Sequence, residues 1–367
     1  MEKILILTNS INGLYNFRRE LVDRLIQDGF EVIISAPIDE KTDFFTKLGT
    51  KNIATPINSR GKNPLSDIKL LIKYIKILKA VKPNVVLSYT IKPNVYGGLA
   101  CRLFNIPILA NITGLGSAVE KKGLLQNITL FLYRVSLRKA SCIFFQNEEN
   151  QKFFTSKNIG TDTHKLIPGS GVNLEHFKVL DYPDEKEVNF LFIARIIKEK
   201  GIDQYLEAAE YIRGKYPYTR FHIIGDSDEQ YNNRLIGMQN KGIVTYHGRQ
   251  NDVREFHKIS HCTIHPTYYP EGMSNVLLES AASGRPIITT NRAGCREVVN
   301  DNVNGYIAEQ KNSEDLIKKI EDFLRLDYKD KIQMGLEGRK KVEREFDRQI
   351  IVNAYMTEIS SIIENTE

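Results

Sequence analysis

The sequence lacks any long uninterrupted apolar run: no stretch reaches the roughly 18 apolar residues that a membrane-spanning helix needs. Cysteine is also scarce. The four cysteines, Cys101, Cys142, Cys262 and Cys295, lie far apart with no C-x-x-C pair, which argues against a disulfide framework or a zinc site and favours a reducing cytoplasm. The first residues, MEKILILTNS, show no signal-peptide cleavage pattern and are interpreted as a buried strand.

Two further patterns are missing. His257 and His261 are four residues apart, but no HExxH sequence or third ligand accompanies them, so we interpret both as structural. The basic segments lack interleaved stacking aromatics and any nucleic-acid-binding motif, so we do not expect nucleic acid as a partner.

What the chain does contain is typical of a globular protein. Its 367 residues are 41% apolar and 26% charged, which allows two sizeable cores. The net charge of +6 is uneven: residues 1–170 hold 24 Lys and Arg against 13 Asp and Glu, and the remainder holds 27 against 32. A basic front half and a mildly acidic back half suggest two domains with different partners, and a basic half suits an anionic membrane.

Short apolar runs alternate with amphipathic segments such as 17–27 and 204–215. The expected strands are 4–8, 32–36, 85–88, 106–112, 143–146, 188–193, 220–225, 244–247, 262–266 and 287–290. Continuous apolar strands alternating with helices predict parallel, doubly wound α/β sheets. Because the pattern restarts near residue 188, the sequence predicts two Rossmann-like domains in tandem.

The domain boundaries follow from the same pattern. Residues 1–170 are expected to form the N-terminal domain and 171–345 the C-terminal domain. Residues 172–187 are polar and contain a proline, as a linker would. Residues 330–363 have helical periodicity, and we expect the helix over 346–367 to pack back on the N-terminal domain.

The most informative stretch is EGMSNVLLESAASGRP, residues 271–286. It follows an apolar strand and a loop, Ser274 is a plausible N-cap, and the glycine and proline at its end stop a helix. The backbone N–H groups of Met273, Ser274 and Asn275 are therefore expected at a helix N-terminus, which suits a diphosphate.

Two carboxylates bracket that anion site, Glu271 in the loop and Glu279 in the helix. Like charges do not bind phosphate, so both are interpreted as acceptors for hydroxyl groups, one set on a sugar and one on a ribose. The alternative is an ordinary strand–loop–helix unit with two exposed glutamates.

This string resembles the E-x7-E element of retaining glycosyltransferases of the GT-B fold, in particular glycosyltransferase family 4, and the resemblance extends over nearly the whole chain. The family's basic pair appears as ARIIKEKG, with Arg195 and Lys200 after the first strand of the second domain. The resemblance implies two Rossmann-like domains facing across a cleft, with Arg195, Lys200 and Glu271 as catalytic residues. Such cations neutralise a diphosphate leaving group.

Other segments fit the same family. NSINGLYNFRRE resembles its glycine-containing turn after the first strand, where Gly13 would let the backbone approach the diphosphate. IIGDSDE, with Gly225, resembles the loop bordering the base, and YHGRQNDV, with Arg249, the segment that reads uracil. AGCREVV is similar to the family's G-G-x-x-E turn, and PGSGVN to its interdomain segment. The implied donor site thus comprises Gly13, Gly225, Arg249, Met273, Ser274, Asn275 and Glu279.

Asp226-Ser227-Asp228 forms a D-x-D string, which binds a divalent metal in the other large glycosyltransferase fold. Here it lies in the base-facing loop, and the basic pair already supplies positive charge. We interpret it as a solvated turn and expect no metal and no other cofactor, the UDP-sugar being a substrate.

The acceptor side is expected in the first domain. SYTIKPNVYGG follows a strand, which directs attention to Lys92 and Asn94. NITGLGSAVEKKG follows another, with Thr113, Gly114 and Gly116 as candidates. Many family members place a histidine near this second position and this chain has none, so no catalytic base is assigned. The GLGS string resembles members that extend lipid-linked oligosaccharides. Loops that merely pack are the alternative for both stretches.

Two segments are basic and amphipathic. Residues 65–81 place Ile68, Leu71, Ile72, Ile75 and Leu78 on one helical face and Lys69, Lys73, Lys76 and Lys79 on another. Residues 123–139 combine Leu124, Leu125, Ile128, Phe131 and Leu132 with Arg134, Arg138 and Lys139, after Lys121 and Lys122. We expect the first to pack on the sheet and the second to contact an anionic bilayer.

The resemblance implies a retaining glycosyltransferase that moves a sugar, of N-acetylhexosamine type, from a UDP-sugar to a polyprenyl-diphosphate-linked saccharide. This would occur in capsule, O-antigen or related synthesis, at the inner face of the bacterial membrane. Two alternatives remain: a UDP-N-acetylhexosamine 2-epimerase of the same fold, and a non-catalytic nucleotide-sugar-binding protein. The sugar, the linkage and the oligomeric state stay open.

Overall fold

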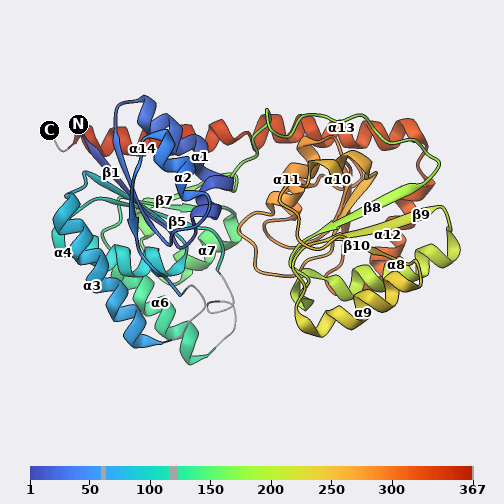
Figure 1. The fold of residues 1–367 in the computed structure, drawn as a ribbon, viewed down its shortest axis with the longest axis horizontal. Helices are drawn as coiled ribbons and strands as arrows, with labels where there is room; N and C mark the ends of the chain where they lie inside the picture. Colours follow the sequence, from blue (N-terminus) through green and yellow to red (C-terminus); the bar gives the residue numbers. More distant parts are fainter. Residues whose placement is uncertain (59–62, 116–118, 120–122, 366–367) are drawn as a thin grey trace. The chain divides into compact units, whose positions relative to one another are not determined.

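The computed structural model describes residues 1–58, 63–115, 119 and 123–365. The chain divides into two compact units, residues 1–170 with 348–367 and residues 171–347. Each unit is built on one parallel β-sheet (Figure 1).

The first unit has a seven-stranded sheet in the order β3-β2-β1-β4-β5-β6-β7. Its strands are β1 (Lys3–Leu7), β2 (Glu31–Ala36), β3 (Lys51–Ala54), β4 (Val85–Tyr89), β5 (Ile108–Ile112), β6 (Cys142–Phe145) and β7 (His164–Leu166). Its helices are α1 (Ile11–Gln27), α2 (Thr42–Leu48), α3 (Pro64–Val81), the π-helix η1 (Pro93–Gly97), α4 (Gly98–Phe104), α6 (Leu124–Ser136), α7 (Glu148–Ser156), the 3-10 turn η2 (Thr161–Thr163) and α14 (Arg348–Glu364).

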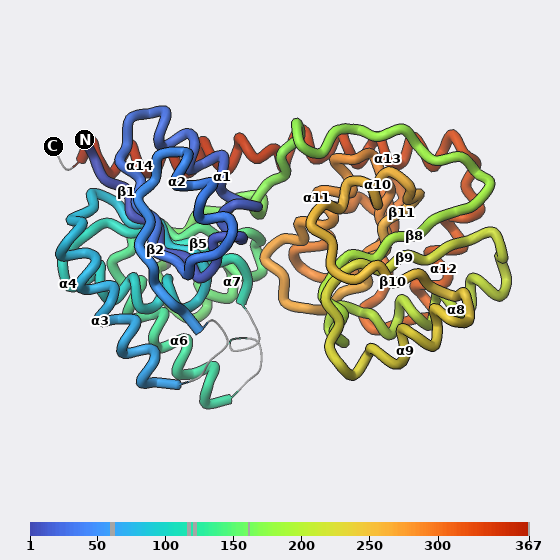
Figure 2. The backbone as a smooth tube through the Cα atoms, in the orientation of Figure 1, coloured from blue at the N-terminus to red at the C-terminus, as the bar shows by residue number. Residues whose placement is uncertain are grey.

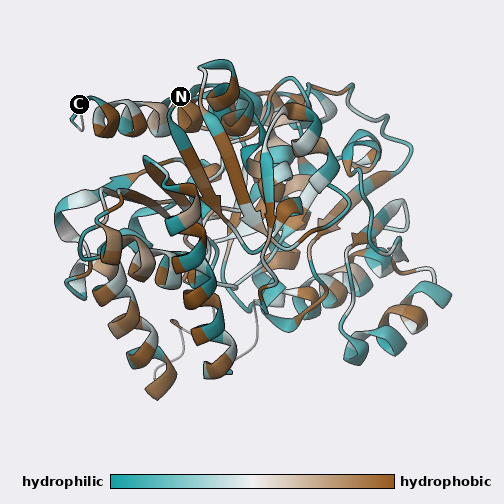
Figure 3. Cartoon of the chain, turned by 60° about the vertical axis from the view of Figure 1, so that its left-hand side comes forward, coloured by the Kyte–Doolittle hydropathy of each residue, from teal (hydrophilic) through white to brown (hydrophobic). Residues whose placement is uncertain are grey.

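The central strands of this sheet are almost wholly buried, and Figure 3 draws strands of the chain in the brown of hydrophobic residues. One apolar cluster joins a sheet face to α3, α4 and α6, and the other joins the opposite face to α1, α2 and α14. The helix α14 packs beside α1 (Figure 2), where Arg348 pairs with Glu20 at 3.0 Å. The last helix of the chain thus completes the layer that residues 1–170 begin.

The second unit has a six-stranded sheet in the order β10-β9-β8-β11-β12-β13. Its strands are β8 (Val188–Ile193), β9 (Thr219–Ile224), β10 (Thr245–Tyr246), β11 (Cys262–His265), β12 (Ile287–Thr290) and β13 (Gly305–Ala308). Its helices are the 3-10 turn η3 (Lys198–Lys200), α8 (Ile202–Lys215), α9 (Glu229–Asn240), α10 (Arg254–Ile259), α11 (Asn275–Ala282), the 3-10 turn η4 (Arg296–Val298), α12 (Ser313–Arg325) and α13 (Tyr328–Glu345).

Apolar side chains of α8, α9 and α12 cover one side of this sheet, and those of α11 and α13 form a separate cluster with β12 and η4.

The two doubly wound sheets confirm the predicted fold class. All ten expected strands are present, although several ends differ by one or two residues. The helical segment expected over 330–363 is two helices, α13 and α14.

One local prediction is wrong. Gly13 does not lie in a turn: α1 already begins at Ile11, and the Gly13 N–H donates to the N-cap oxygen Ser10 Oγ at 2.9 Å. The prediction that α3 packs on the sheet is confirmed, but its buried face is Leu70, Tyr74, Ile77 and Leu78, with Leu71 and Ile75 partly buried beside it, whereas Ile68 and Ile72 are 53% and 46% exposed. The helix α3 has more apolar residues than the sheet can cover, so helical periodicity alone did not identify which of them are buried.

Candidate donor site

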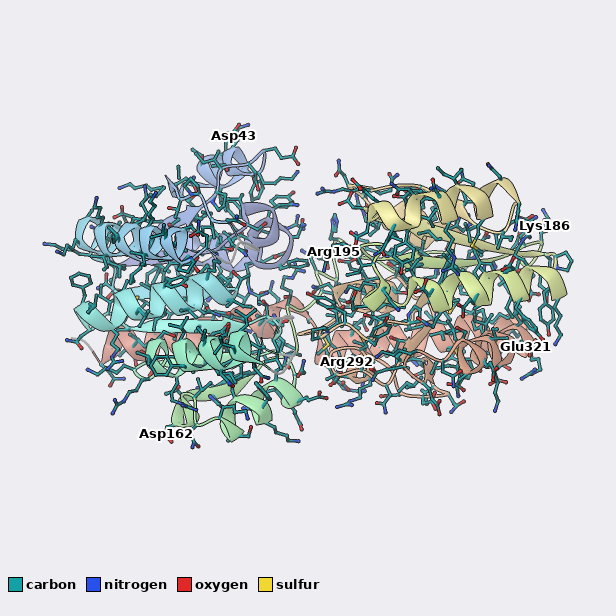
Figure 4. All side chains as sticks on the ribbon, turned by 90° about the horizontal axis from the view of Figure 1, so that it is seen from below. Asp43, Asp162, Lys186, Arg195, Arg292 and Glu321 are labelled. Carbon is teal, nitrogen blue, oxygen red and sulfur yellow. The ribbon has the colours of Figure 1, made fainter. Side chains whose placement is uncertain are left out.

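The candidate site lies at the carboxyl edge of the second sheet. Arg195 follows β8, Gly225 follows β9, and Glu271 lies in the loop after β11. Since the strands are parallel, their carboxyl ends meet at one edge, where open α/β sheets bind ligands. Figure 4 shows Arg195 and Arg292 at this end of the unit, whereas Lys186, which precedes β8, lies at the other end.

The helix α11 starts at this edge. Its N-cap is Ser274, as predicted, but the Ser274 side chain makes no capping hydrogen bond, and its N–H donates to the Gly294 carbonyl at 2.7 Å. The prediction that the Ser274 N–H faces an anion is therefore wrong. The first N–H groups of the helix, beginning with Asn275, lack intrahelical acceptors by geometry. The Met273 side chain is buried in the core beneath them.

Gly294 fixes the loop before α11. Its φ is +86°, and a Cβ there would lie 2.7 Å from the Gly272 carbonyl oxygen and 2.9 Å from Glu271 Cβ. The same glycine donates its N–H to Glu297 Oε2 at 2.7 Å. Because only glycine allows this close approach, the AGCREVV turn holds the backbone that carries Glu271.

Lys200 and Glu271 form an ion pair, with their side chains only 13% and 15% exposed. The Lys200 ammonium also lies 4.9 Å from the centre of the Tyr269 ring, and the Arg195 guanidinium carbon lies 5.5 Å from it. A half-buried aromatic ring thus lies against both cations, which we call the cation pair (Arg195 and Lys200). The structure brings together the three residues predicted as catalytic.

Gly225 has a strict requirement for glycine. Its φ is +142°, and a Cβ would lie 1.8 Å from the Ala194 carbonyl oxygen, directly before Arg195. Its N–H donates to the Gly248 carbonyl at 2.9 Å, which draws the segment containing Arg249 to the end of β9. The predicted base-facing loops therefore adjoin the cation pair through the backbone.

The D-x-D string is a surface turn. The Ile196 N–H donates to the Asp226 carbonyl at 2.8 Å and the Asp228 N–H to the Ile196 carbonyl at 3.2 Å. Asp226 lies 3.7 Å from Arg249, and both side chains are more than 60% exposed. Across the described parts of the chain, no group of three or more His, Cys, Asp or Glu residues has the geometry of a metal site.

Glu279 lies on α11 and is partly buried. It is the fifth residue of the helix, so it stands about one turn beyond the N–H groups that suit an anion. The element predicted from residues 271–279 therefore has its carboxylates on either side of the helix start.

Two acceptor-side candidates of the first unit, Lys92 and Asn94, are less accessible than the sequence suggested. Asn94 is fully buried, donating to the Asn111 carbonyl at 2.8 Å and accepting from Ser88 Oγ at 2.7 Å. Lys92 pairs with Asp67 at 2.7 Å, with its side chain 13% exposed. The two hydrogen bonds of Asn94 connect η1 to β4 and β5, so Asn94 has a structural role.

Thr113 is exposed after β5, and Gly114 follows it with a φ of +143°. Gly116 and Ser117 of the GLGS string lie outside the described residues, as do Lys121 and Lys122.

Sequence reasoning missed two residues. Thr90, after β4, has a φ of +74° and a buried Oγ1 with no hydrogen-bond partner, an unusual state for a β-branched residue. It lies where the sheet order reverses between β1 and β4, a position where ligands bind in such folds. His265, at the end of β11, lies 4.0 Å from Glu271. No sequence pattern marks a strained backbone or a contact with a distant loop.

The contacts of His257 and His261 support their interpretation as structural. His261 Nδ1 accepts from the Asn189 N–H at 3.0 Å and Nε2 lies 2.9 Å from the Asp184 carbonyl, and burial lowers the pKa of His261 to about 4. His257 is fully buried in α10, and burial together with Arg285 lowers its pKa to about 3.

Two family models match the chain. The model for glycosyl transferases group 1 matches residues 175–341, and the glycosyl transferase 4-like model matches residues 3–147. Among curated proteins, the N,N'-diacetylbacillosaminyl-diphospho-undecaprenol alpha-1,3-N-acetylgalactosaminyltransferase of Campylobacter jejuni is 28% identical, covering 96% of this chain and 97% of its own. The UDP-Gal:alpha-D-GlcNAc-diphosphoundecaprenol alpha-1,3-galactosyltransferase of Escherichia coli is 26% identical, covering 79% and 81%.

Solved structures share the fold. A glycosyltransferase from Rickettsia africae has a TM-score of 0.81 at 19% identity, covering 99% of each chain. HepE of Anabaena, in complex with UDP and glucose, has a TM-score of 0.79 at 16% identity, covering 98% of this chain and 100% of its own. The family matches extend over both units, and the chain belongs to the glycosyltransferases of the GT-B fold, with a group 1 C-terminal domain and a family 4-like N-terminal domain.

Proposed function

We propose that this glycosyltransferase moves a sugar from a UDP-sugar to an undecaprenyl-diphosphate-linked saccharide, with retention of anomeric configuration. One observation carries the donor half: in residues 171–347 the cation pair, Glu271 and the start of α11 converge at one sheet edge. Positive charge and free N–H groups suit a diphosphate, and the carboxylates suit hydroxyl groups.

Each residue has a distinct proposed role. The cation pair and the N–H groups from Asn275 onward stabilise the charge that develops on the departing diphosphate. Glu271 accepts hydrogen bonds from the transferred sugar and Glu279 from the ribose. The cations replace a metal ion in this scheme, so we propose that turnover needs none. Gly13 remains a candidate for the diphosphate, although its N–H is bonded to Ser10.

The absence of an assigned base shapes the proposed mechanism. The acceptor hydroxyl attacks from the face that the diphosphate leaves, and a diphosphate oxygen takes its proton. Retention follows from attack on that face. The names of both curated relatives specify an alpha linkage, the configuration that a retaining enzyme gives from an alpha-linked UDP-sugar.

The acceptor and the sugar rest on the relatives. Both named proteins act on a diphosphoundecaprenol-linked sugar, and the Campylobacter jejuni protein transfers an N-acetylated hexosamine. The capsular polysaccharide biosynthesis glycosyltransferase CapM of Staphylococcus aureus is also similar, at 25% identity. We therefore propose an N-acetylhexosamine as the sugar and bacterial surface polysaccharide as the product.

A membrane-facing surface suits such an acceptor. Leu124, Ile128 and Phe131 on α6 are 76%, 47% and 59% exposed, and Ile68 and Ile72 are exposed on α3. Both helices pack on η1 and both carry basic residues. Apolar side chains beside lysines favour an anionic bilayer, so we propose peripheral binding at the inner face of the membrane. None of the described helices is both long and apolar enough to span a bilayer.

Product analysis by mass spectrometry, together with chromatography that separates epimeric UDP-sugars of equal mass, tests the proposed function. The purified protein is incubated with each UDP-sugar, with and without an undecaprenyl-diphosphate-linked N-acetylhexosamine, in the presence of EDTA. The proposal predicts a lipid-linked product heavier by one sugar and no change to the donor alone. An epimerised UDP-N-acetylhexosamine without acceptor would support the epimerase alternative, and a requirement for Mn2+ would contradict the metal-independent mechanism.

A further inference from the structure

His265 is buried at the carboxyl end of β11 with no hydrogen bond to either ring nitrogen. Its exposed fraction is 1%, and neither Nδ1 nor Nε2 has a partner. A buried polar group without a partner costs free energy, so such a residue calls for an explanation within the site that it adjoins.

The imidazole lies beside the two charged residues of the site. Nε2 is 4.0 Å from Glu271 Oε1, and the ring packs against Phe192 with centroids 6.4 Å apart. Burial, and then the positive charge of Lys200, lowers the pKa of His265 well below its usual value. The ring is therefore neutral at physiological pH and carries one N–H group.

Lys200 holds Glu271 by an ion pair. In the proposed function, however, Lys200 neutralises the diphosphate while Glu271 holds the sugar. One ammonium group on a flexible stem then has to leave the carboxylate, at least in part, when the donor binds. A further donor at Glu271 would then make up for the lost contact with Lys200.

We propose that His265 is a positioning residue that holds Glu271 once Lys200 has turned to the diphosphate. The Nε2–H group donates a hydrogen bond to the Glu271 carboxylate, which needs a closure of only about 1 Å from the present 4.0 Å to an ordinary bond length. Glu271 then keeps its charge and direction for the sugar hydroxyls. The inference rests on the proposed function.

Three variants separate positioning from packing. His265→Phe keeps a ring against Phe192 but removes the N–H. His265→Gln places an amide nitrogen near the position of Nε2. His257→Phe is the matched control, because His257 is also fully buried with neither ring nitrogen partnered, and it lies on α10. If His265→Phe does not fold, His265→Asn, whose amide ends short of Nε2, replaces it.

Steady-state kinetics and calorimetric UDP binding are measured for each variant. We expect His265→Phe to lower kcat roughly 10–100-fold, as for side chains that orient metal ligands, and to weaken UDP binding much less than that, since UDP lacks the sugar that Glu271 holds. His265→Gln should recover most of kcat, and His257→Phe should match wild type.

The outcomes distinguish this inference from the proposed function. If wild-type protein neither binds UDP-sugars nor transfers sugar, the proposed function fails. If wild type transfers sugar but His265→Phe keeps full kcat, or His265→Gln is as slow as His265→Phe, the positioning role is wrong and the proposed function stands.

Discussion

Replacing Glu271 with glutamine should tighten UDP binding while slowing sugar transfer. The Glu271 carboxylate pairs with the Lys200 ammonium, so under the proposed function it competes with a diphosphate for that cation. Glutamine keeps the shape of the side chain and removes the charge, so Lys200 becomes available to the diphosphate. The transferred sugar at the same time loses its carboxylate partner.

The magnitude follows from the burial of the pair. The two side chains are 13% and 15% exposed, so the pair is intermediate between an exposed and a fully buried ion pair. An exposed pair contributes about 0.2–1 kcal/mol, and removing one partner of a buried pair costs about 3–5 kcal/mol. We take about 1–2 kcal/mol for the competition, which corresponds to roughly 5- to 30-fold tighter UDP binding.

Isothermal titration calorimetry with UDP measures this change. Glu279→Gln is the matched control, since it removes a carboxylate of α11 that the proposed function assigns to the ribose, and we expect it to weaken UDP binding by roughly 10-fold. Unchanged or weaker UDP binding by Glu271→Gln would refute the competition between carboxylate and diphosphate.

Three more predictions concern the site and its support. Tyr269→Leu removes the ring that contacts the cation pair and should lower kcat/KM by roughly 10-fold in steady-state assays, whereas Tyr269→Phe should not. Gly225→Ala forces a Cβ against Ala194 and should lower Tm by about 5 °C or more, whereas Gly237→Ala, with nothing within 4 Å, should leave Tm unchanged or raise it. The pKa of His257 is about 3 when folded, below its unfolded value, so its contribution to stability is present above about pH 6.5 and is lost as pH falls. In urea unfolding between pH 6 and 4, His257→Phe should reduce the slope of stability against pH by about 1.4 kcal/mol per unit, and an unchanged slope would contradict the shift.

The sequence predicted the interior of both sheets well and their edges poorly. The three strands that it did not predict, β3, β7 and β13, are all edge strands of three or four residues. Most residues of β3 and β7 are at least partly exposed. Without a continuous apolar run such strands resemble loops, and only pairing with a neighbour identifies them.

The candidate site was predicted in composition but not in its contacts. The string around Glu271 and Glu279 marked the carboxylates and the helix start, and ARIIKEKG marked the cations. The sequence could not show that Lys200 and Glu271, 71 residues apart, pair with each other. Nor could it show that the Ser274 N–H is used by a glycine 20 positions later. Such contacts depend on packing between loops, which periodicity does not encode.

Transfer of labelled sugar in a single turnover tests the central claim most directly. Wild type and Lys200→Met are each mixed in excess with a radiolabelled UDP-N-acetylhexosamine and undecaprenyl-diphosphate-linked acceptor in EDTA, and label is counted in the lipid fraction. We predict that label enters the lipid fraction with wild type and that Lys200→Met is about 10²–10³-fold slower. Equal rates for the two proteins, or no lipid-linked label with any UDP-sugar, would contradict the assignment of this site.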